Sequence, residues 1–210
     1  MKLTKRKTIV IATSKIVKEF KDLEYEIKLE CLQKDKSLSE LLNLVEVVLD
    51  SITRYQMDKV QTVTEMISHF LVDTKNEYSV FRYNGKVMLK IKQHHILQSL
   101  QFPIFKNKEY FIYDGSEIIN KLKGNNIIYV GNMIKRRIKD FIIDGDDGRV
   151  YSLAITICET SGQLQHQLEV EYYGYLSGYE KIDKNNESEI LERLSELSNF
   201  IYNSVVQNSL

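Results

Sequence analysis

Proline, glycine, cysteine and tryptophan are scarce in this chain of 210 residues. With one proline, nine glycines, no low-complexity tract and no internal repeat, the sequence excludes long linkers and a solenoid. Its two cysteines, Cys31 and Cys158, lack metal-ligand spacing and are too few for a disulfide framework, which fits a cytoplasmic protein with reduced thiols. No apolar run is long enough to cross a bilayer, and no signal-peptide pattern follows Met1. We therefore expect one compact domain over residues 1–210 without a membrane partner.

An excess of charge of either sign is also missing. Lys and Arg together number 29, as do Asp and Glu, so no global field attracts the chain to nucleic acid or to a membrane. Hydrophobic residues make up 43% and charged residues 28%, which is the composition of a globular protein and not of a disordered one. Any chemistry based on charge must therefore be local.

Alternating patterns predict most of the strands. Residues 23–31 alternate apolar and charged side chains, and Gln167 to Tyr175 do the same, which indicates strands with one apolar and one polar face. Asn84-Gly85 divides the segment 78–92 and predicts a hairpin, because both turn residues need positive φ. Further strands are expected within 58–72, 109–113, 127–130, 132–143 and 149–158.

Helical spacing predicts three helices. A capping box, Ser37 with Glu40, opens a helix that continues to about residue 49. A shorter helix spans 116–123, and an amphipathic helix spans 188–206, where it packs on the sheet or pairs with a second subunit. Residues 8–20 fit a short helix or a strand equally well. About eight strands joined by short turns, with three or four helices, indicate an α+β protein built on an antiparallel sheet or barrel.

Four of the predicted strands carry two like charges at positions i and i+2, and therefore on one face. For a single pair, a solvated face of a half-buried sheet is the more common explanation. Four such rows are harder to dismiss, because like charges so placed repel one another. If these faces line a barrel, the acidic rows can bind a hard divalent cation, Mg²⁺ or Mn²⁺, and the basic rows a polyanion such as triphosphate. The rows are Glu24/Glu26, Lys90/Lys92, Lys135/Arg137 and Glu169/Glu171.

Five segments in this order resemble motifs of the CYTH, or triphosphate tunnel metalloenzyme, superfamily, with coverage from about residue 20 to 175. Glu24-Tyr-Glu-Ile-Lys28 resembles the E-x-E-x-K signature, and Glu169-Val-Glu171 resembles the terminal E-x-E. Between them, Phe70-Leu-Val-Asp73-Thr74 is similar to a Y-x-D-T segment, Arg82 to Lys92 to a hairpin that ends in an inward lysine, and Lys135-Arg-Arg137 to a K-x-R strand.

The resemblance implies a closed, eight-stranded antiparallel β-barrel with flanking helices, with 1–20 as an N-terminal extension and 187–208 as a C-terminal helix. It implies a hydrolase that uses Mg²⁺ or Mn²⁺ to release the γ-phosphate of a triphosphate. By position, the metal ligands and catalytic residues are Glu24, Glu26, Glu169 and Glu171. The residues that hold phosphate oxygens are Lys28, Arg82, Lys92, Lys135 and Arg137, with Lys90 as a weaker candidate.

Some positions depart from the family's pattern. Val80 stands where the family often has a first basic residue, and Ala154-Ile-Thr156 lacks an aspartate that is common there. Parts of the C-terminal half also resemble RNA 5′-triphosphatases of the mRNA capping type, in which a third acidic residue stands at the position of Tyr173.

Several functions therefore stay open. The substrate is inorganic triphosphate, a nucleotide, thiamine triphosphate or an RNA 5′ end, and the alternatives to hydrolysis are a class IV-like nucleotidyl cyclase and a non-catalytic triphosphate- or polyphosphate-binding module. A structural or interaction protein with solvated charged strands is a further alternative. A homodimer through the last helix is also open. The histidines, including His94, are expected to be surface or core residues without a catalytic role.

Overall fold

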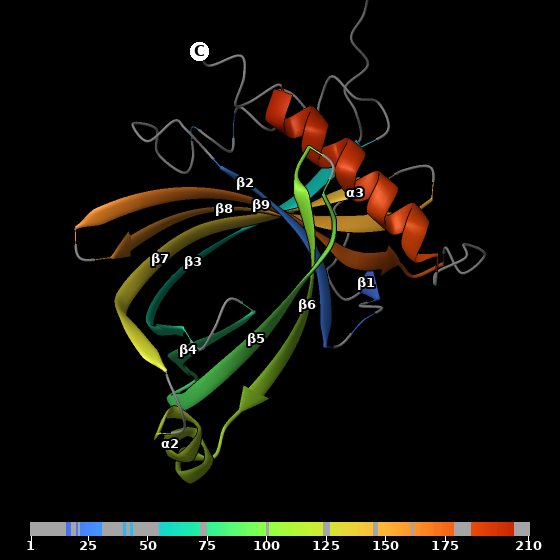
Figure 1. Ribbon diagram of the computed structural model, residues 1–210. Coiled ribbons are helices and arrows are strands. Elements are labelled where there is room, and N and C mark those ends of the chain that lie inside the picture. The colour runs from blue at the N-terminus through green and yellow to red at the C-terminus, as the bar shows by residue number, and fades with distance from the viewer. Residues whose placement is uncertain are drawn as a thin grey trace, which may run out of the picture.

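The computed structural model describes residues 16–17, 20, 22–30, 40, 43, 55–71, 75–99, 101–123, 127–144, 147–160, 162–178 and 186–203. Within these ranges the chain forms nine strands and two helices (Figure 1). The strands are β1 (Ile16–Val17), β2 (Leu23–Glu30), β3 (Tyr55–Leu71), β4 (Asn76–Tyr83), β5 (Lys86–Ser99), β6 (Pro103–Ile112), β7 (Ile128–Asp144), β8 (Arg149–Thr160) and β9 (Gln163–Leu176). The helices are α2 (Gly115–Lys123) and α3 (Glu187–Ile201).

Most predicted elements are present, with some different bounds. The separate strands expected at 127–130 and 132–143 are one continuous strand, β7, and the strand expected at 109–113 is the end of β6. The predicted helix 37–49 lies outside the described residues, apart from Glu40 and Asn43, which are helical. The last helix ends at Ile201, and 204–208 of the predicted span also lie outside the described residues.

Eight strands close into an antiparallel barrel. They follow one another as β2-β6-β5-β4-β3-β7-β8-β9, and β9 returns to pair with β2, so the circle has no open edge. The two residues of β1 add to β9 through Ile16↔Leu176 and Val17↔Tyr175, which attaches part of the predicted N-terminal extension to the sheet. The predicted fold, a closed eight-stranded antiparallel barrel with helices, is confirmed.

The predicted hairpin is also confirmed. Asn84 and Gly85 have φ values of 49° and 77°, the left-handed conformation that a two-residue turn of this kind requires. This turn fixes the register of β4 on β5, with Glu77 opposite Lys92 and Arg82 opposite Val87.

The main hydrophobic core lies outside the barrel wall, between the last helix and the outward faces of β2, β8 and β9, with single residues of β6 and β7. The apolar positions of β2, such as Ile27 and Leu29, are buried together with Leu168 and Val170 of β9. Helix α3 lies across these strands (Figure 1). Its buried apolar side chains are Ile190, Leu194, Leu197 and Ile201. Since this face of β2 and β9 is apolar, the alternating polar face must turn to the inside of the barrel.

Polar contacts fix α3 in this position. The side chain of Asn186 caps the helix by accepting a hydrogen bond from the backbone N–H of Glu189. The buried guanidinium of Arg149 donates to Asp147 at 2.6 Å and to Glu189 at 2.7 Å. On the other side of the molecule, Ile118 of α2 packs on β5. In the part of the chain that the structure describes, no helix has the length and apolar character needed to cross a membrane.

The burial of α3 predicts a large stability loss on truncation of its apolar side chains. Leu194 is fully buried, so Leu194→Ala should lower the free energy of unfolding by about 3 kcal/mol, through lost apolar burial and the cavity left behind. Leu164→Ala is the matched control because Leu164 is 52% exposed, and its effect should stay within about 0.5 kcal/mol. Denaturant unfolding measures both, and equal losses would contradict the position of α3.

Candidate functional site

The inside of the barrel holds a charged cavity of about 270 Å³. Seven of the eight barrel strands contribute to its wall, which carries both acidic and basic side chains beside a few apolar ones. The lining residues are Glu24, Glu26, Lys28, Ile67, Glu77, Ser79, Phe81, Lys90, Lys92, Phe111, Lys135, Arg137, Glu169 and Glu171.

Nine of the ten site residues proposed from the sequence line this cavity, and Arg82 is the one that does not. Because side chains alternate along β4, Glu77, Ser79 and Phe81 face the cavity, whereas Arg82 is exposed. Val80 packs outside the barrel against the cluster of Leu89, Ile91 and Ile118. The basic residue expected at position 80 would therefore not have faced the cavity either.

The acidic rows of β2 and β9 lie side by side. These strands are antiparallel neighbours, with Glu26 directly opposite Glu171 and Lys28 directly opposite Glu169. Carboxylates directly opposite each other repel, so this pairing calls for a nearby cation or hydrogen-bond donor. The structure supplies both kinds of partner: Lys28 Nζ lies 3.4 Å from Glu26 and 3.7 Å from Glu169, and Ser152 Oγ donates to Glu171 at 2.9 Å.

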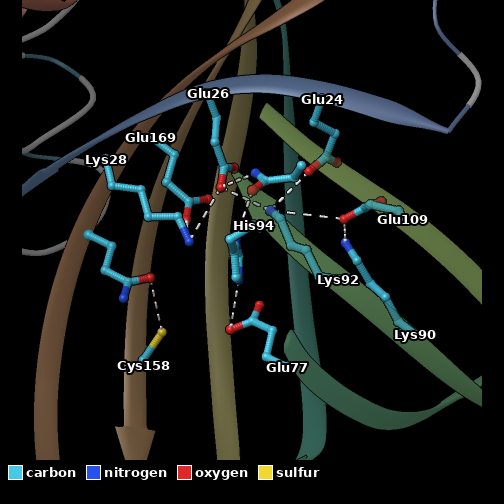
Figure 2. Close-up of polar contacts among 12 residues, drawn as sticks. Glu24, Glu26, Lys28, Glu77, Lys90, Lys92, His94, Glu109, Cys158 and Glu169 are labelled. Atoms are coloured by element: carbon cyan, nitrogen blue, oxygen red, sulfur yellow. Dashed lines mark hydrogen bonds and ion pairs between the residues drawn. The ribbon is translucent and has the colours of Figure 1, made fainter. Parts of the chain in front are cut away.

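A buried lysine joins the carboxylates of β2. Figure 2 shows Glu24 and Glu26 pointing from β2 toward Lys92, whose Nζ lies 2.9 Å from Glu24 and 3.0 Å from Glu26. The side-chain amide of Asn107 donates to the same oxygen of Glu26 at 2.6 Å. Beside them, Lys90 forms an ion pair with Glu109.

This network moves the pKa values of its members. Burial alone would raise the pKa of Glu24, but the positive charges of Lys92 and Lys90 lower it to about 2. The pKa of Glu26 is lowered too, since Lys92 and Lys28 outweigh its burial. Burial would lower the pKa of Lys92, but Glu26 and Glu24 raise it well above its usual value. These groups are therefore ionised at neutral pH.

A histidine links two strands to the same network. His94 Nε2 lies 3.5 Å from a carboxylate oxygen of Glu77, and His94 Nδ1 lies 2.7 Å from Asn107 Oδ1. Since Asn107 donates through its nitrogen to Glu26, a continuous polar chain runs Glu77–His94–Asn107–Glu26. The hydrogen bond to Glu77 is the main reason that the pKa of His94 is raised. Burial would raise the pKa of Glu77, but the hydrogen bond to His94 and the charge of Lys28 lower it to about 2.

Four of these residues were not predicted from the sequence: Glu77, His94, Asn107 and Glu109. The inward position of Glu77 could have been predicted, because the two-residue turn at Asn84-Gly85 places Glu77 opposite Lys92. His94 continues the face of Lys90 and Lys92 along β5, whereas its contact with Asn107 and the place of Glu109 depend on how β5 and β6 pair, with Glu109 opposite Lys92 and Asn107 opposite His94.

The donors fit a hard divalent cation by their chemistry. Glu24, Glu26, Glu169 and Glu171 offer only carboxylate oxygens to one cavity, the ligands that Mg²⁺ and Mn²⁺ prefer. Among the described residues, however, no three His, Cys, Asp or Glu side chains are grouped closely enough to hold an ion. In this arrangement Lys92 and Lys28 supply the counter-charges of the carboxylates instead.

No protein-family model matches the chain, and no curated protein matches it. Solved structures of similar shape include the PH1012 protein from Pyrococcus horikoshii OT3, at 13% identity and a TM-score of 0.49, covering 85% of this chain and 89% of that one. The PH1819 protein of the same organism has 16% identity and a TM-score of 0.48, covering 87% and 90%. The RNA triphosphatase Pct1 of S. pombe, in complex with the Spt5 CTD, has 13% identity and a TM-score of 0.47, covering 89% and 86%.

At such low identities and scores these likenesses do not define an activity. The barrel itself closes with eight antiparallel strands, and both Glu-x-Glu rows line its cavity. The closed eight-stranded antiparallel fold that the sequence resemblance implied is confirmed by the strand pairing. What this barrel does has to be inferred from the residues inside it.

The central place of Lys92 can be tested by acid titration. Because the folded pKa of Glu24 is about 2, below its ordinary value of 4.5, this carboxylate contributes stability above pH 4.5 that is lost as the pH falls toward 2. Lys92→Met should raise that pKa, and it should lower the free energy of unfolding at pH 7 by about 3–5 kcal/mol, because buried carboxylates lose their partner. The variant should then lose less stability than the wild type between pH 4.5 and 2.

The free energy of unfolding is measured with denaturant across this pH range. Lys86→Met is the control, because Lys86 lies on the same strand and is exposed. An acid profile of Lys92→Met that follows the wild type would show that Lys92 does not hold the carboxylates.

Proposed function

We propose that this protein is a divalent-metal-dependent hydrolase that releases the γ-phosphate of a triphosphate bound inside the barrel. The observation that carries the proposal is the cavity lining, where both Glu-x-Glu rows meet the basic rows. Buried like charges on neighbouring strands do not favour folding by themselves. A polyanion with a divalent cation is a ligand that matches both sets of charges at once.

The basic residues suit the binding of phosphate oxygens. Lys135 and Arg137 bring two cationic side chains to the cavity from β7, and Lys28 brings a third from β2. Transfer of a phosphoryl group depends mainly on alignment with the nucleophile and on neutralisation of charge, which fixed cations provide. Lys90 and Lys92 already form ion pairs in the carboxylate network. Lys92 pairs with Glu24 and Glu26, and Lys90 pairs with Glu109.

The glutamates suit metal binding better than proton transfer. A bound Mg²⁺ or Mn²⁺ would neutralise charge on the γ-phosphate, and Glu24, Glu26, Glu169 and Glu171 are the residues to hold it. Glu24, with a pKa of about 2, is a weak base, and Glu26 also has a lowered pKa. The acidic rows would therefore act as anionic ligands and orient the attacking water.

A binding module without catalysis is the second candidate. It is favoured by one observation: among the described residues, no three potential ligands are gathered for a metal ion. A barrel whose carboxylates stay paired with lysines could bind triphosphate through Lys135 and Arg137 and not hydrolyse it.

Adjacent arginines of β7 offer a matched test of binding. Arg137 lines the cavity, whereas Arg136 is exposed and pairs with Glu159 at 3.2 Å. Arg137→Ala should weaken tripolyphosphate binding about tenfold or more, because a charge-assisted hydrogen bond is lost, and Arg136→Ala should leave it unchanged. The readout is the rise in melting temperature when tripolyphosphate and Mg²⁺ are added. Absence of any rise in the wild type would exclude both the hydrolase and the binding module.

Catalysis is tested by neutralising one carboxylate at a time. Glu169→Gln and Glu26→Gln should each reduce phosphate release from tripolyphosphate by on the order of a hundredfold or more, since each removes a charge that the transition state requires. Glu159→Gln, on the barrel exterior, should keep wild-type activity.

Phosphate and pyrophosphate are both measured, with Mg²⁺ and with Mn²⁺. Undiminished phosphate release in both cavity variants would refute the assignment. Binding without turnover would establish the binding module, and pyrophosphate release from a nucleotide would establish a cyclase.

A further inference from the structure

A second, larger cavity adjoins the charged one. Its volume is about 550 Å³, within the range of small-molecule sites, and it shares Lys28 with the charged cavity. The other lining residues are Lys75, His94, His95, Ile96 and Phe105.

The two cavities are joined by the same strand faces. Along β5 the face that carries Lys90 and Lys92 continues through His94 to Ile96. Along β6 the matching face leads from Asn107 to Phe105, which pairs directly with Ile96. Phe105 and Ile96 therefore give the second cavity one apolar wall, beside the charged and polar side chains of Lys28, Lys75, His94 and His95.

This apolar wall is held in place. The rings of His94 and Phe105 meet edge to face, with centroids 6.1 Å apart and an interplanar angle of 74°. The His94 ring is also fixed by Asn107 and by Glu77, the latter contact being visible in Figure 2. The backbone N–H of His94 donates to the carbonyl of Lys75 at 2.7 Å, which keeps Lys75 at the same rim.

We propose that this second cavity binds the nucleobase of a nucleoside 5′-triphosphate, with Phe105 and Ile96 against the base and Lys28 at the junction with the phosphates. This inference rests on the proposed function and selects among its substrates. A bare triphosphate would make no use of the apolar wall. The nucleoside comes either from a free nucleotide or from the first residue of an RNA 5′ end, which present the same chemistry.

Charge distinguishes the base from the ring of thiamine. The lining carries Lys28 and Lys75, and the hydrogen bond to Glu77 raises the pKa of His94 and favours its cationic form. A neutral base is compatible with these cations, whereas the positively charged thiazolium of thiamine triphosphate would gain no attraction from them.

The test compares substrates with and without an aromatic ring. For Phe105→Ala and Ile96→Ala, kcat/KM is measured with ATP, 5′-triphosphorylated RNA, thiamine triphosphate and tripolyphosphate. The ratio of ATP to tripolyphosphate should fall about tenfold in Phe105→Ala, because base–aromatic stacking is lost, and a few-fold in Ile96→Ala. Ile128→Ala is the matched control, since Ile128 is 65% exposed and Ile96 is 64% exposed, and it should leave the ratio unchanged.

The outcomes separate this inference from the proposed function. Phosphate release from tripolyphosphate with an unchanged ratio in Phe105→Ala and Ile96→Ala overturns the base site and leaves the hydrolase standing. No phosphate release from any substrate overturns the hydrolase. In that case the dissociation constants of ATP and tripolyphosphate are measured by calorimetry, and their ratio in Phe105→Ala and Ile96→Ala decides the base site. A preference of the wild type for thiamine triphosphate over ATP also overturns the base site. The comparison of ATP with 5′-triphosphorylated RNA identifies the source of the nucleoside.

Discussion

Lys92 is the charge on which the inside of the barrel depends. A lysine ammonium removed from water is costly unless anions surround it, and here Glu24 and Glu26 lie within 2.9 and 3.0 Å. Those carboxylates in turn would be unfavourable on neighbouring positions of β2 without Lys92. The amide of Asn107 adds a further donor to Glu26. The acidic row is thus held toward the cavity by its own counter-charge, before any ligand binds.

A charged interior forces the hydrophobic core to lie elsewhere. A barrel that buries apolar side chains inside needs no cover, but here the apolar faces of β2 and β9 turn outward. Helix α3 covers them, and Arg149 ties the first turn of that helix to the turn before β8 through Asp147 and Glu189. The stability of the fold and the polarity of the cavity are therefore two results of one alternating pattern, since each strand has only two faces.

The same alternation explains what could be predicted and what could not. In β2 and β9 it is unbroken, and it placed both Glu-x-Glu rows correctly in the cavity. Arg82 was assigned because the segment Arg82 to Lys92 resembles a hairpin of the family, although the two-residue turn at Asn84-Gly85 puts Arg82 opposite Val87, on the outer face. His94 was expected to have no catalytic role, and no local pattern linked it to Asn107, which belongs to another strand. Its pairing follows from a register shift between Ile96 and Gln98 that no local pattern reveals.

The lysine–carboxylate pairs also bear on how a triphosphate and a metal would bind, if the proposed function holds. Lys28 contacts both acidic rows, at Glu26 and Glu169, and it lies where the two cavities meet. A phosphate that attracts Lys28 frees carboxylate oxygens for a cation, and a cation on those oxygens frees Lys28 for phosphate. Each ligand then improves the site of the other, and thermodynamic linkage makes the effect equal in both directions. Among the described residues no three potential ligands are grouped for a metal ion, although four carboxylates face the cavity. The two observations are compatible if a bound triphosphate would complete the metal site.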